Sequence, residues 1–173
     1  SPKSAADVIR RFEGFRTSTY WDVNAHRTGY GSDTITKADG SVVRVQQGMT
    51  VSRADAERDL QRRIDKEFVP GIISSVGKDA WATMPDGAKA ALTSVAYNYG
   101  SLNKLQTVVN AARSGNLQQL AQAIEARGAD NNGVNAKRRK EEAAAVLGAG
   151  VQGGSQNASM LSDGLSDGLM NDN

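Results

Sequence analysis

The chain has 173 residues, which is enough for one domain with a hydrophobic core. It has no cysteine, which excludes disulfide bonds and thiolate metal sites, and its single histidine, His26, argues against a histidine metal cluster or a Ser-His-Asp triad. The net charge is +2. Three aspartates and no basic residue follow Leu147, so residues 1–147 carry about +5, which favours an anionic partner such as a bacterial wall or nucleic acid.

The sequence gives no sign of membrane insertion or of secretion. No apolar run approaches the ~20 residues that a membrane span requires, and residues 1–4 lead directly into a helical pattern without a signal peptide. We therefore expect a protein without a membrane span that is synthesised in the cytoplasm. If it acts outside the cytoplasm, another component must deliver it there.

The first predicted element is a short amphipathic helix. Ser4, with Asp7 three residues later, resembles an N-terminal capping box, and apolar residues follow at helical spacing up to Phe12. Gly14 provides a stop signal. Glu13 is therefore expected in the last turn, next to the point where the chain enters the following segment.

Residues 15–48 predict a small antiparallel sheet, the only β signal that we find in the chain. Asp39-Gly40 is a hairpin-turn signal, and β-favouring residues flank it at 34–36 and 42–45.

The rest of the body predicts helices. One begins after a cap at Thr50 or Ser52 and is broken by Pro70-Gly71. Its charged face suits either a wall-binding or nucleic-acid strip or a solvated face with mixed ion pairs, and the interleaved acids favour the second interpretation. The further helices are expected at about 72–76, from 86 to Gly100, and at 102–112, 117–127 and 134–147. The fold class is thus α+β, mostly helical, with a small β-hairpin lobe.

The composition changes at Gly148. Residues 148–173 are rich in Gly, Ser, Asn and Asp, and the sequence Ser-Asp-Gly-Leu occurs twice in tandem at 162–169. Such a composition buries too little apolar surface to offset the entropy of ordering. We predict a domain over residues 1–147 and a flexible tail over 148–173, and the repeat is a candidate docking motif.

The most informative residues are two carboxylates and a hydroxyl near the start of the chain, Glu13, Asp22 and Thr28. Hydrolysis of a sugar–sugar bond needs one carboxyl group that donates a proton and a second that activates water on the other face of the ring. Phe12 and Phe15 should partly desolvate Glu13, which favours the acid role. Asp22 lies in a polar hairpin and should stay ionised, and Thr28 could hold the water. A surface glutamate and a simple turn remain the structural alternatives.

These residues carry a family resemblance. The arrangement Glu-x8-Asp-x5-Thr, followed by Gly-Tyr-Gly at 29–31, resembles the phage-type lysozymes, the endolysin muramidases of glycoside hydrolase family 24. Residues 91–100 resemble the core helix of that family, and residues 133–143 resemble its basic C-terminal helix. The resemblance covers residues 5 to about 147 and implies a two-lobed lysozyme-like fold with the active cleft between the lobes.

The resemblance implies a metal-free and cofactor-free muramidase that cleaves the β-1,4 bond between N-acetylmuramic acid and N-acetylglucosamine in peptidoglycan. Glu13 would be the general acid, Asp22 would activate the water with inversion, and Thr28 would assist. Tyr97 and Asn98 match the aromatic and amide positions of the family's cleft, and we include Tyr30 among the substrate-binding residues.

The resemblance also implies that one basic residue of the last helix pairs with Glu13 across the cleft. Lys137, Arg138 and Arg139 are the candidates, and we select Arg138 as a site residue. Such a pairing would oppose the effect of desolvation on Glu13.

The chain departs from the family pattern at one position. The family usually has one more residue between the threonine and Gly-Tyr-Gly, whereas Thr28 directly precedes Gly29 here. Alignment on the two acids selects Thr28 as the third catalytic residue, and alignment on Gly-Tyr-Gly selects Arg27. His26 lies in the same loop and is interpreted as a rim or surface residue.

Two other functions remain open. A lytic transglycosylase shares the Ala-Tyr-Asn-x-Gly pattern at 96–100 but uses one glutamate, so Asp22 argues against it. A non-catalytic wall-binding or virion module would explain the tail but not the acid pair. Nucleic-acid binding is disfavoured because no reader motif is present. As a muramidase the protein would act in the periplasm or wall, either as an endolysin that depends on a holin or as a virion (tail) component docked through its C-terminal tail.

Overall fold

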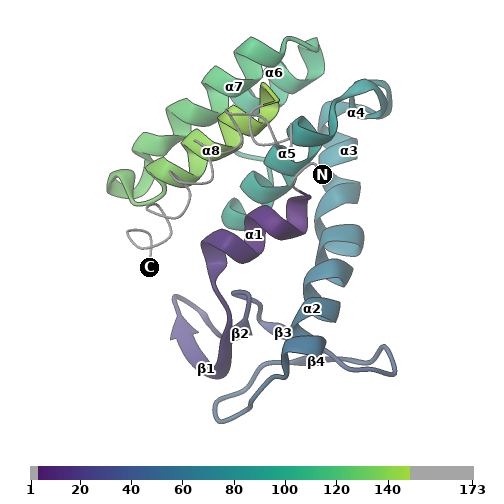
Figure 1. The fold of residues 1–173 in the computed structure, drawn as a ribbon, viewed down its shortest axis with the longest axis vertical. Coiled ribbons are helices and arrows are strands. Elements are labelled where there is room, and N and C mark those ends of the chain that lie inside the picture. Colours follow the sequence, from purple (N-terminus) through teal and green to yellow (C-terminus); the bar gives the residue numbers. More distant parts are fainter. Residues whose placement is uncertain (1–3, 149–173) are drawn as a thin grey trace.

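The computed structural model describes residues 4–148 and has two lobes. Figure 1 shows a β lobe at one end, a group of helices at the other, and α1 between them. The β lobe contains β1 (Arg16–Asp22), β2 (Ala25–Gly29), β3 (Thr34–Thr36) and β4 (Val42–Arg44). The helical elements are α1 (Ala5–Glu13), α2 (Arg53–Arg62), the π-helix η1 (Arg63–Phe68), α3 (Val69–Val76), α4 (Lys78–Thr83), α5 (Asp86–Tyr99), α6 (Gln106–Ser114), α7 (Leu117–Ala126), the 3-10 segment η2 (Arg127–Gly133) and α8 (Ala136–Val146). This mostly helical α+β architecture confirms the predicted fold class. Apart from Gly148, the predicted tail lies outside the described residues.

The start of α1 confirms the predicted capping box. The Ser4 hydroxyl accepts a hydrogen bond from the Asp7 backbone N–H, and the Asp7 carboxylate accepts one from the Ser4 N–H. These two bonds satisfy N–H groups that a helix start leaves without partners. The helix ends at Glu13 because Gly14 adopts φ 70°, a left-handed conformation that favours glycine.

The β lobe differs from the prediction because it contains two separate hairpins. The hairpin of β3 and β4 has the predicted turn, but β1 and β2 form a second antiparallel pair in which Asp22 lies opposite Ala25. Strand β1 is largely exposed on both faces, so it lacks the apolar alternation that identifies a half-buried strand. The turn requires φ 55° at Val23, which is unusual for a β-branched residue and gives no sequence signal.

The predicted helix break at Pro70-Gly71 is wrong. The segment from α2 through η1 to α3 is helical throughout, and Figure 1 shows it as one long rod from the β lobe to the far end of the helical lobe. A proline inside an α-helix lacks an N–H and clashes with the carbonyl four residues earlier. The π-helix η1 directly precedes Val69 and Pro70. Its wider turn shifts the carbonyl that would otherwise clash with the proline ring, so the chain stays helical through Pro70.

The charged face of α2 is less solvated than expected. Asp59 is 2% exposed, and its carboxylate accepts hydrogen bonds from the hydroxyls of Ser32, Thr34 and Thr36, with Arg62 beside it. A buried carboxylate persists only when such partners replace water. The predicted ion pairs are present, but part of this face anchors the β3 segment to the long helix.

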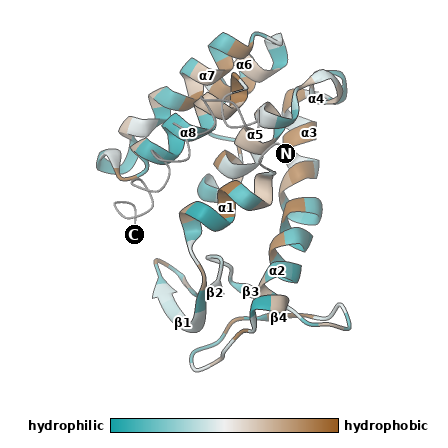
Figure 2. Cartoon of the chain, in the orientation of Figure 1, coloured by the Kyte–Doolittle hydropathy of each residue, from teal (hydrophilic) through white to brown (hydrophobic). Residues whose placement is uncertain are grey.

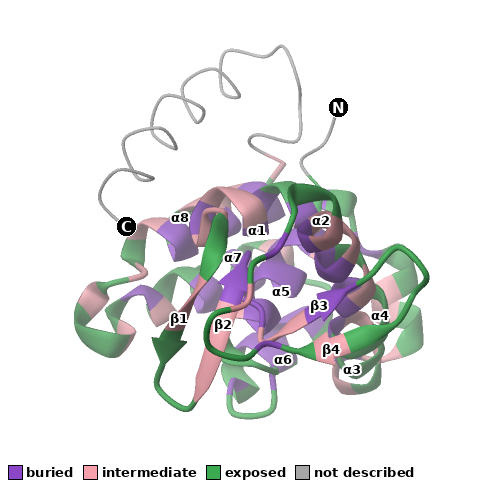
Figure 3. Ribbon diagram, turned by 90° about the horizontal axis from the view of Figure 1, so that it is seen from below, coloured by how far each residue is buried: buried purple, intermediate pink, exposed green. Residues whose placement is uncertain are grey.

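Helix α5 is the centre of the helical lobe. Figure 3 shows it buried among the other helices, and Ala88, Ala91, Leu92 and Val95 are fully buried. Small side chains let α1 and α8 pack against it. Figure 2 shows hydrophobic residues concentrated on the inward sides of the helices and polar residues outside. One core cluster joins both lobes, and it includes Ile35 from β3 as well as α5.

Sequence reasoning located the remaining helices but misplaced several ends. Helix α6 begins four residues later than expected because residues 102–105 form a turn, and α8 begins at Ala136 because η2 precedes it. The short helix α4 was not predicted. None of the helices within residues 4–148 is long and apolar enough to cross a membrane.

Candidate active site

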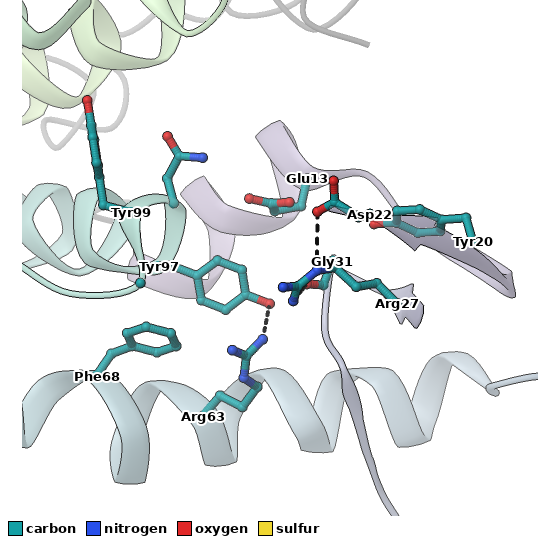
Figure 4. A pocket seen from close by; sticks show the side chains of 11 residues that line it. Glu13, Tyr20, Asp22, Arg27, Gly31, Arg63, Phe68, Tyr97 and Tyr99 are labelled. Atoms are coloured by element: carbon teal, nitrogen blue, oxygen red, sulfur yellow. Dashed lines mark hydrogen bonds and ion pairs between the residues drawn. The ribbon is translucent and has the colours of Figure 1, made fainter. Parts of the chain in front are cut away.

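A pocket of about 270 Å³ is lined by both lobes and contains Glu13 and Asp22 (Figure 4). Its walls come from α1, the β1–β2 hairpin and the segment after it, η1 and the C-terminal end of α5. The lining residues are Glu13, Tyr20, Asp22, Arg27, Gly31, Arg63, Phe68, Tyr97, Asn98, Tyr99 and Gly100. The lining therefore combines two carboxylates, two arginines, aromatic rings and one amide.

Glu13 is held by Arg138, which was one of three predicted partners. Arg138 Nη1 donates to Glu13 Oε2 at 2.9 Å, and the arginine side chain is 3% exposed while that of Glu13 is 21% exposed. The same guanidinium donates to the Ser94 side chain and backbone carbonyl. Arg138 is thus fixed from α5 and contacts the acid from below the pocket surface instead of lining the pocket.

The charge of Arg138 is shared with a second buried pair. Glu142, one helical turn later in α8, lies 3.4 Å from Arg138 and also accepts two hydrogen bonds from Arg139. Arg139 and Glu142 are 0% and 1% exposed. Buried charges are tolerated when they are paired and hydrogen-bonded. The two arginines and the carboxylates of Glu13 and Glu142 form such a balanced group.

Asp22 ends β1 and lies more open to solvent than Glu13, with 53% of its side chain exposed. Its Oδ2 is 3.2 Å from Arg27 Nε, which satisfies an ion-pair distance. The Nε–H does not point well enough at this oxygen to make a hydrogen bond, and it is buried without another acceptor among residues 4–148. Arg27 Nη1 donates instead to the Gly31 carbonyl at 3.2 Å.

Gly31 brings the β lobe into direct contact with Glu13. Its φ is +74°, and a Cβ built at this position would lie 2.6 Å from Glu13 Oε1. A side chain here is therefore disfavoured by the positive φ and would displace the Glu13 carboxylate. Glu13 is held between this glycine and Arg138.

Tyr97 connects the lobes beneath the pocket. Its hydroxyl donates to the Tyr30 carbonyl at 2.6 Å and accepts from Arg63 Nη1 at 3.2 Å, and its ring packs on Phe68. Burial raises the pKa of Tyr97 well above its ordinary value, so the hydroxyl keeps its proton for the Tyr30 carbonyl.

Asn98 is oriented by Arg139. Arg139 Nη1 donates to Asn98 Oδ1 at 2.9 Å. The amide oxygen is used in this bond, so the N–H₂ group is the part of Asn98 that can donate to a ligand. Tyr97 and Asn98 both line the pocket as predicted, although the Tyr97 side chain is mostly buried.

Thr28 and Tyr30 are not where the sequence analysis placed them. Thr28 is 1% exposed, and its hydroxyl donates to the backbone carbonyls of Arg16 or Ser18. Side chains alternate along a strand, so Arg27, which pairs with Tyr20, faces the pocket while Thr28 faces the other way. Of the two candidates for the third position, the structure brings Arg27 into the pocket.

Tyr30 is 3% exposed, and its hydroxyl donates to Glu57 at 2.5 Å. It borders a different surface hollow, beside Phe15 and Arg53, and only its carbonyl is linked to the site through Tyr97. His26 packs edge-on against the exposed Trp21 and does not line the pocket, as expected for a surface residue.

Several lining residues were missed by sequence reasoning. Tyr20 could have been found, because it lies two residues before Asp22 and a strand places such residues on one face. Arg63 and Phe68 gave no signal, because they reach the pocket from the π-helix, whose period differs from that of an α-helix.

The arrangement suits cleavage of a glycosidic bond. One carboxyl group is partly shielded from solvent and held by a buried arginine, and the second is open to water on the facing hairpin. Two carboxyl groups at one pocket are what acid-assisted acetal hydrolysis requires.

Comparison with known proteins agrees with this chemistry. The family model for phage lysozyme matches residues 10–142. The crystal structure of a mutant of P22 lysozyme superimposes with a TM-score of 0.64, covering 85% of this chain and 98% of that chain at 24% sequence identity. This likeness confirms the lysozyme-like fold. A search of curated proteins gives no match.

Proposed function

Since the chain belongs to the phage lysozyme family and is a glycoside hydrolase that acts on peptidoglycan, we propose that it is a muramidase. The bond cleaved is the β-1,4 linkage between N-acetylmuramic acid and N-acetylglucosamine. The observation that carries this proposal is the placement of Glu13 and Asp22, from α1 and β1, in one pocket. The first is shielded and the second exposed, which matches the different tasks of the two groups.

In the proposed reaction Glu13 delivers its proton to the oxygen of the leaving sugar. Asp22, as the ionised carboxylate, takes a proton from a water molecule that attacks the other face of the ring and inverts the configuration. Arg138 stabilises the carboxylate that Glu13 becomes after proton transfer. Before the next cycle Asp22 gives up its proton to solvent water, and Glu13 takes one from it.

Substrate recognition is assigned to the pocket lining. The N–H₂ group of Asn98 is placed to donate to an acyl or hydroxyl oxygen of a sugar. The rings of Tyr20 and Tyr99 line the pocket on the hairpin side and the α5 side, where they can pack against sugar faces. Thr28 and Tyr30 have no assigned contact with substrate.

The biological setting that we propose is the bacterial wall or periplasm, during phage lysis or infection. An endolysin of this kind would reach the wall with the help of a holin, whereas a virion component would be carried by the particle through residues 148–173. Detection of the protein in purified particles favours the virion role, and its restriction to lysates of infected cells favours the endolysin role.

The test of the activity compares Glu13→Gln with Glu125→Gln, an exposed position on α7 that does not line the pocket. Loss of the acid should reduce the rate of turbidity loss of a wall suspension by at least ~10²-fold, in the range of general acid catalysis, while the Glu125 variant stays active. Mass analysis of fragments should show one added water per cleavage. Anhydro products would instead identify a lytic transglycosylase, and unchanged turbidity loss in the Glu13 variant would overturn the assignment of this residue.

A further inference from the structure

We propose that Arg27 is the positioning residue for Asp22, taking the place that the sequence pattern reserves for a threonine. The inference deepens the proposed function and rests on it. The hairpin is one residue shorter than the family pattern before Gly-Tyr-Gly, so Arg27 lies in the pocket and Thr28 on the opposite face. The hydroxyl of Thr28 is already used by the backbone of β1.

The contacts of Arg27 link the two halves of the site. Nη1 donates to the Gly31 carbonyl, and Gly31 is the residue whose backbone lies against the Glu13 carboxylate. Nε lies 3.2 Å from Asp22 Oδ2. Arg27 therefore ties Asp22 to the segment that contacts Glu13, so this guanidinium is a direct side-chain link between the two halves of the site.

The chemistry of arginine defines what this residue does. A guanidinium stays protonated in proteins and only donates hydrogen bonds, so Arg27 does not accept the proton of the attacking water. Its Nε–H is buried and has no hydrogen-bond acceptor in the described part of the chain, while Asp22 Oδ2 is an anionic oxygen within ion-pair distance. A small rotation of the Asp22 carboxylate would align this pair. Oδ2 would then be held, and Oδ1 would be the oxygen that takes the proton.

A threonine at this point would act on the water, but an arginine acts through Asp22. This difference gives a measurable signature, because the effect of removing Arg27 should depend on the presence of Asp22. A residue that contacts the substrate or only stabilises the fold would not show that dependence.

The first experiment measures kcat and KM on a soluble peptidoglycan fragment for Arg27→Met, Arg27→Lys and the control Arg44→Met, whose residue is exposed on β4. Arg27→Met should lower kcat by about 10- to 100-fold with KM nearly unchanged, as expected for a misplaced catalytic group. Arg27→Lys should recover part of the loss. An Arg27→Met variant as active as the Arg44 control, or one changed only in KM, would overturn the proposal.

The second experiment is a double-mutant cycle with Asp22→Asn. If Arg27 acts through Asp22, Arg27→Met should cause little further loss in the Asp22→Asn background, whereas independent effects would multiply and refute the idea. Circular dichroism establishes that each variant is folded, and Arg27→Lys keeps the test valid if the methionine variant is not. Anhydro products, or no cleavage at all, from the unaltered protein would instead refute the proposed function, whatever the Arg27 variants do.

Discussion

Replacing Gly31 by alanine should displace the Glu13 carboxylate while leaving the fold intact. The new Cβ would lie 2.6 Å from Glu13 Oε1, so this oxygen must withdraw by about 0.8 Å to reach an ordinary contact of 3.4 Å. The carboxylate cannot simply rotate away without disturbing its 2.9 Å bond to Arg138. The cost therefore falls on the position of the proposed acid.

The expected effect on activity follows from this displacement. A misplacement of about 1 Å at a reacting group can lower a rate by roughly 10²-fold, so we expect kcat to fall by about 10- to 100-fold. Stability should fall by only ~1–2 kcal/mol, the cost of an alanine in the left-handed conformation that Gly31 adopts.

Gly40 offers a matched control. It lies in the β3–β4 turn with φ +88° and has open space where a Cβ would be added. Gly40→Ala should lose a similar amount of stability in urea unfolding and keep its activity in the turbidity assay. Equal activity of the two folded alanine variants would refute the inference that Gly31 positions Glu13.

Two further outcomes can be measured. Tyr97→Phe removes the hydroxyl that joins Arg63 to the Tyr30 carbonyl. It should lower the free energy of unfolding by about 1–3 kcal/mol, because the buried Tyr30 carbonyl loses its hydrogen-bond donor. An unchanged melting temperature would contradict this role of the Tyr97 hydroxyl. Burial acts to raise the pKa of Glu57, but hydrogen bonds from Arg10 and Tyr30 outweigh it and hold the pKa below the ordinary 4.5. The ionised Glu57 carboxylate therefore stabilises the fold above pH 4.5, and this stabilisation is lost as the pH falls through the lower pKa of the folded state. The free energy of unfolding, measured from above pH 4.5 down to acid pH, should depend less on pH in Glu57→Gln than in the unaltered protein. An equal pH dependence would contradict this role of Glu57.

The parts of the fold that were predicted correctly depend on local signals. The capping box at Ser4 and the left-handed glycines that follow α1 and α5 require only neighbouring residues, so the first helix and the core helix were located from sequence. The break at Pro70 was predicted incorrectly because its accommodation depends on the π-helix before it, and no local pattern identified that turn.

In the candidate site, too, local sequence signals predicted some residues correctly, whereas the placement of others depends on the tertiary structure. Glu13, Asp22 and Asn98 line the pocket as expected because their spacing from helix and strand ends fixes the direction in which they point. The choice between Arg27 and Thr28 depends on the register of the β1–β2 hairpin, which a one-residue difference in loop length reverses. Tyr30 was misassigned because only the tertiary structure shows its hydroxyl bonded to Glu57 and away from the pocket.

The buried charges behind Glu13 bear on the proton transfer that the proposed mechanism assigns to this residue. If Arg138 had Glu13 as its only anionic partner, protonation of Glu13 would leave an unpaired buried cation, which is costly. Glu142 lies 3.4 Å from Arg138 and provides a second carboxylate, while Arg139 keeps Glu142 paired in turn. In the proposed mechanism Arg138 and Arg139 therefore share Glu142 while Glu13 is protonated, which leaves one net positive charge beneath the pocket, and the group becomes balanced when Glu13 gives its proton to the leaving sugar.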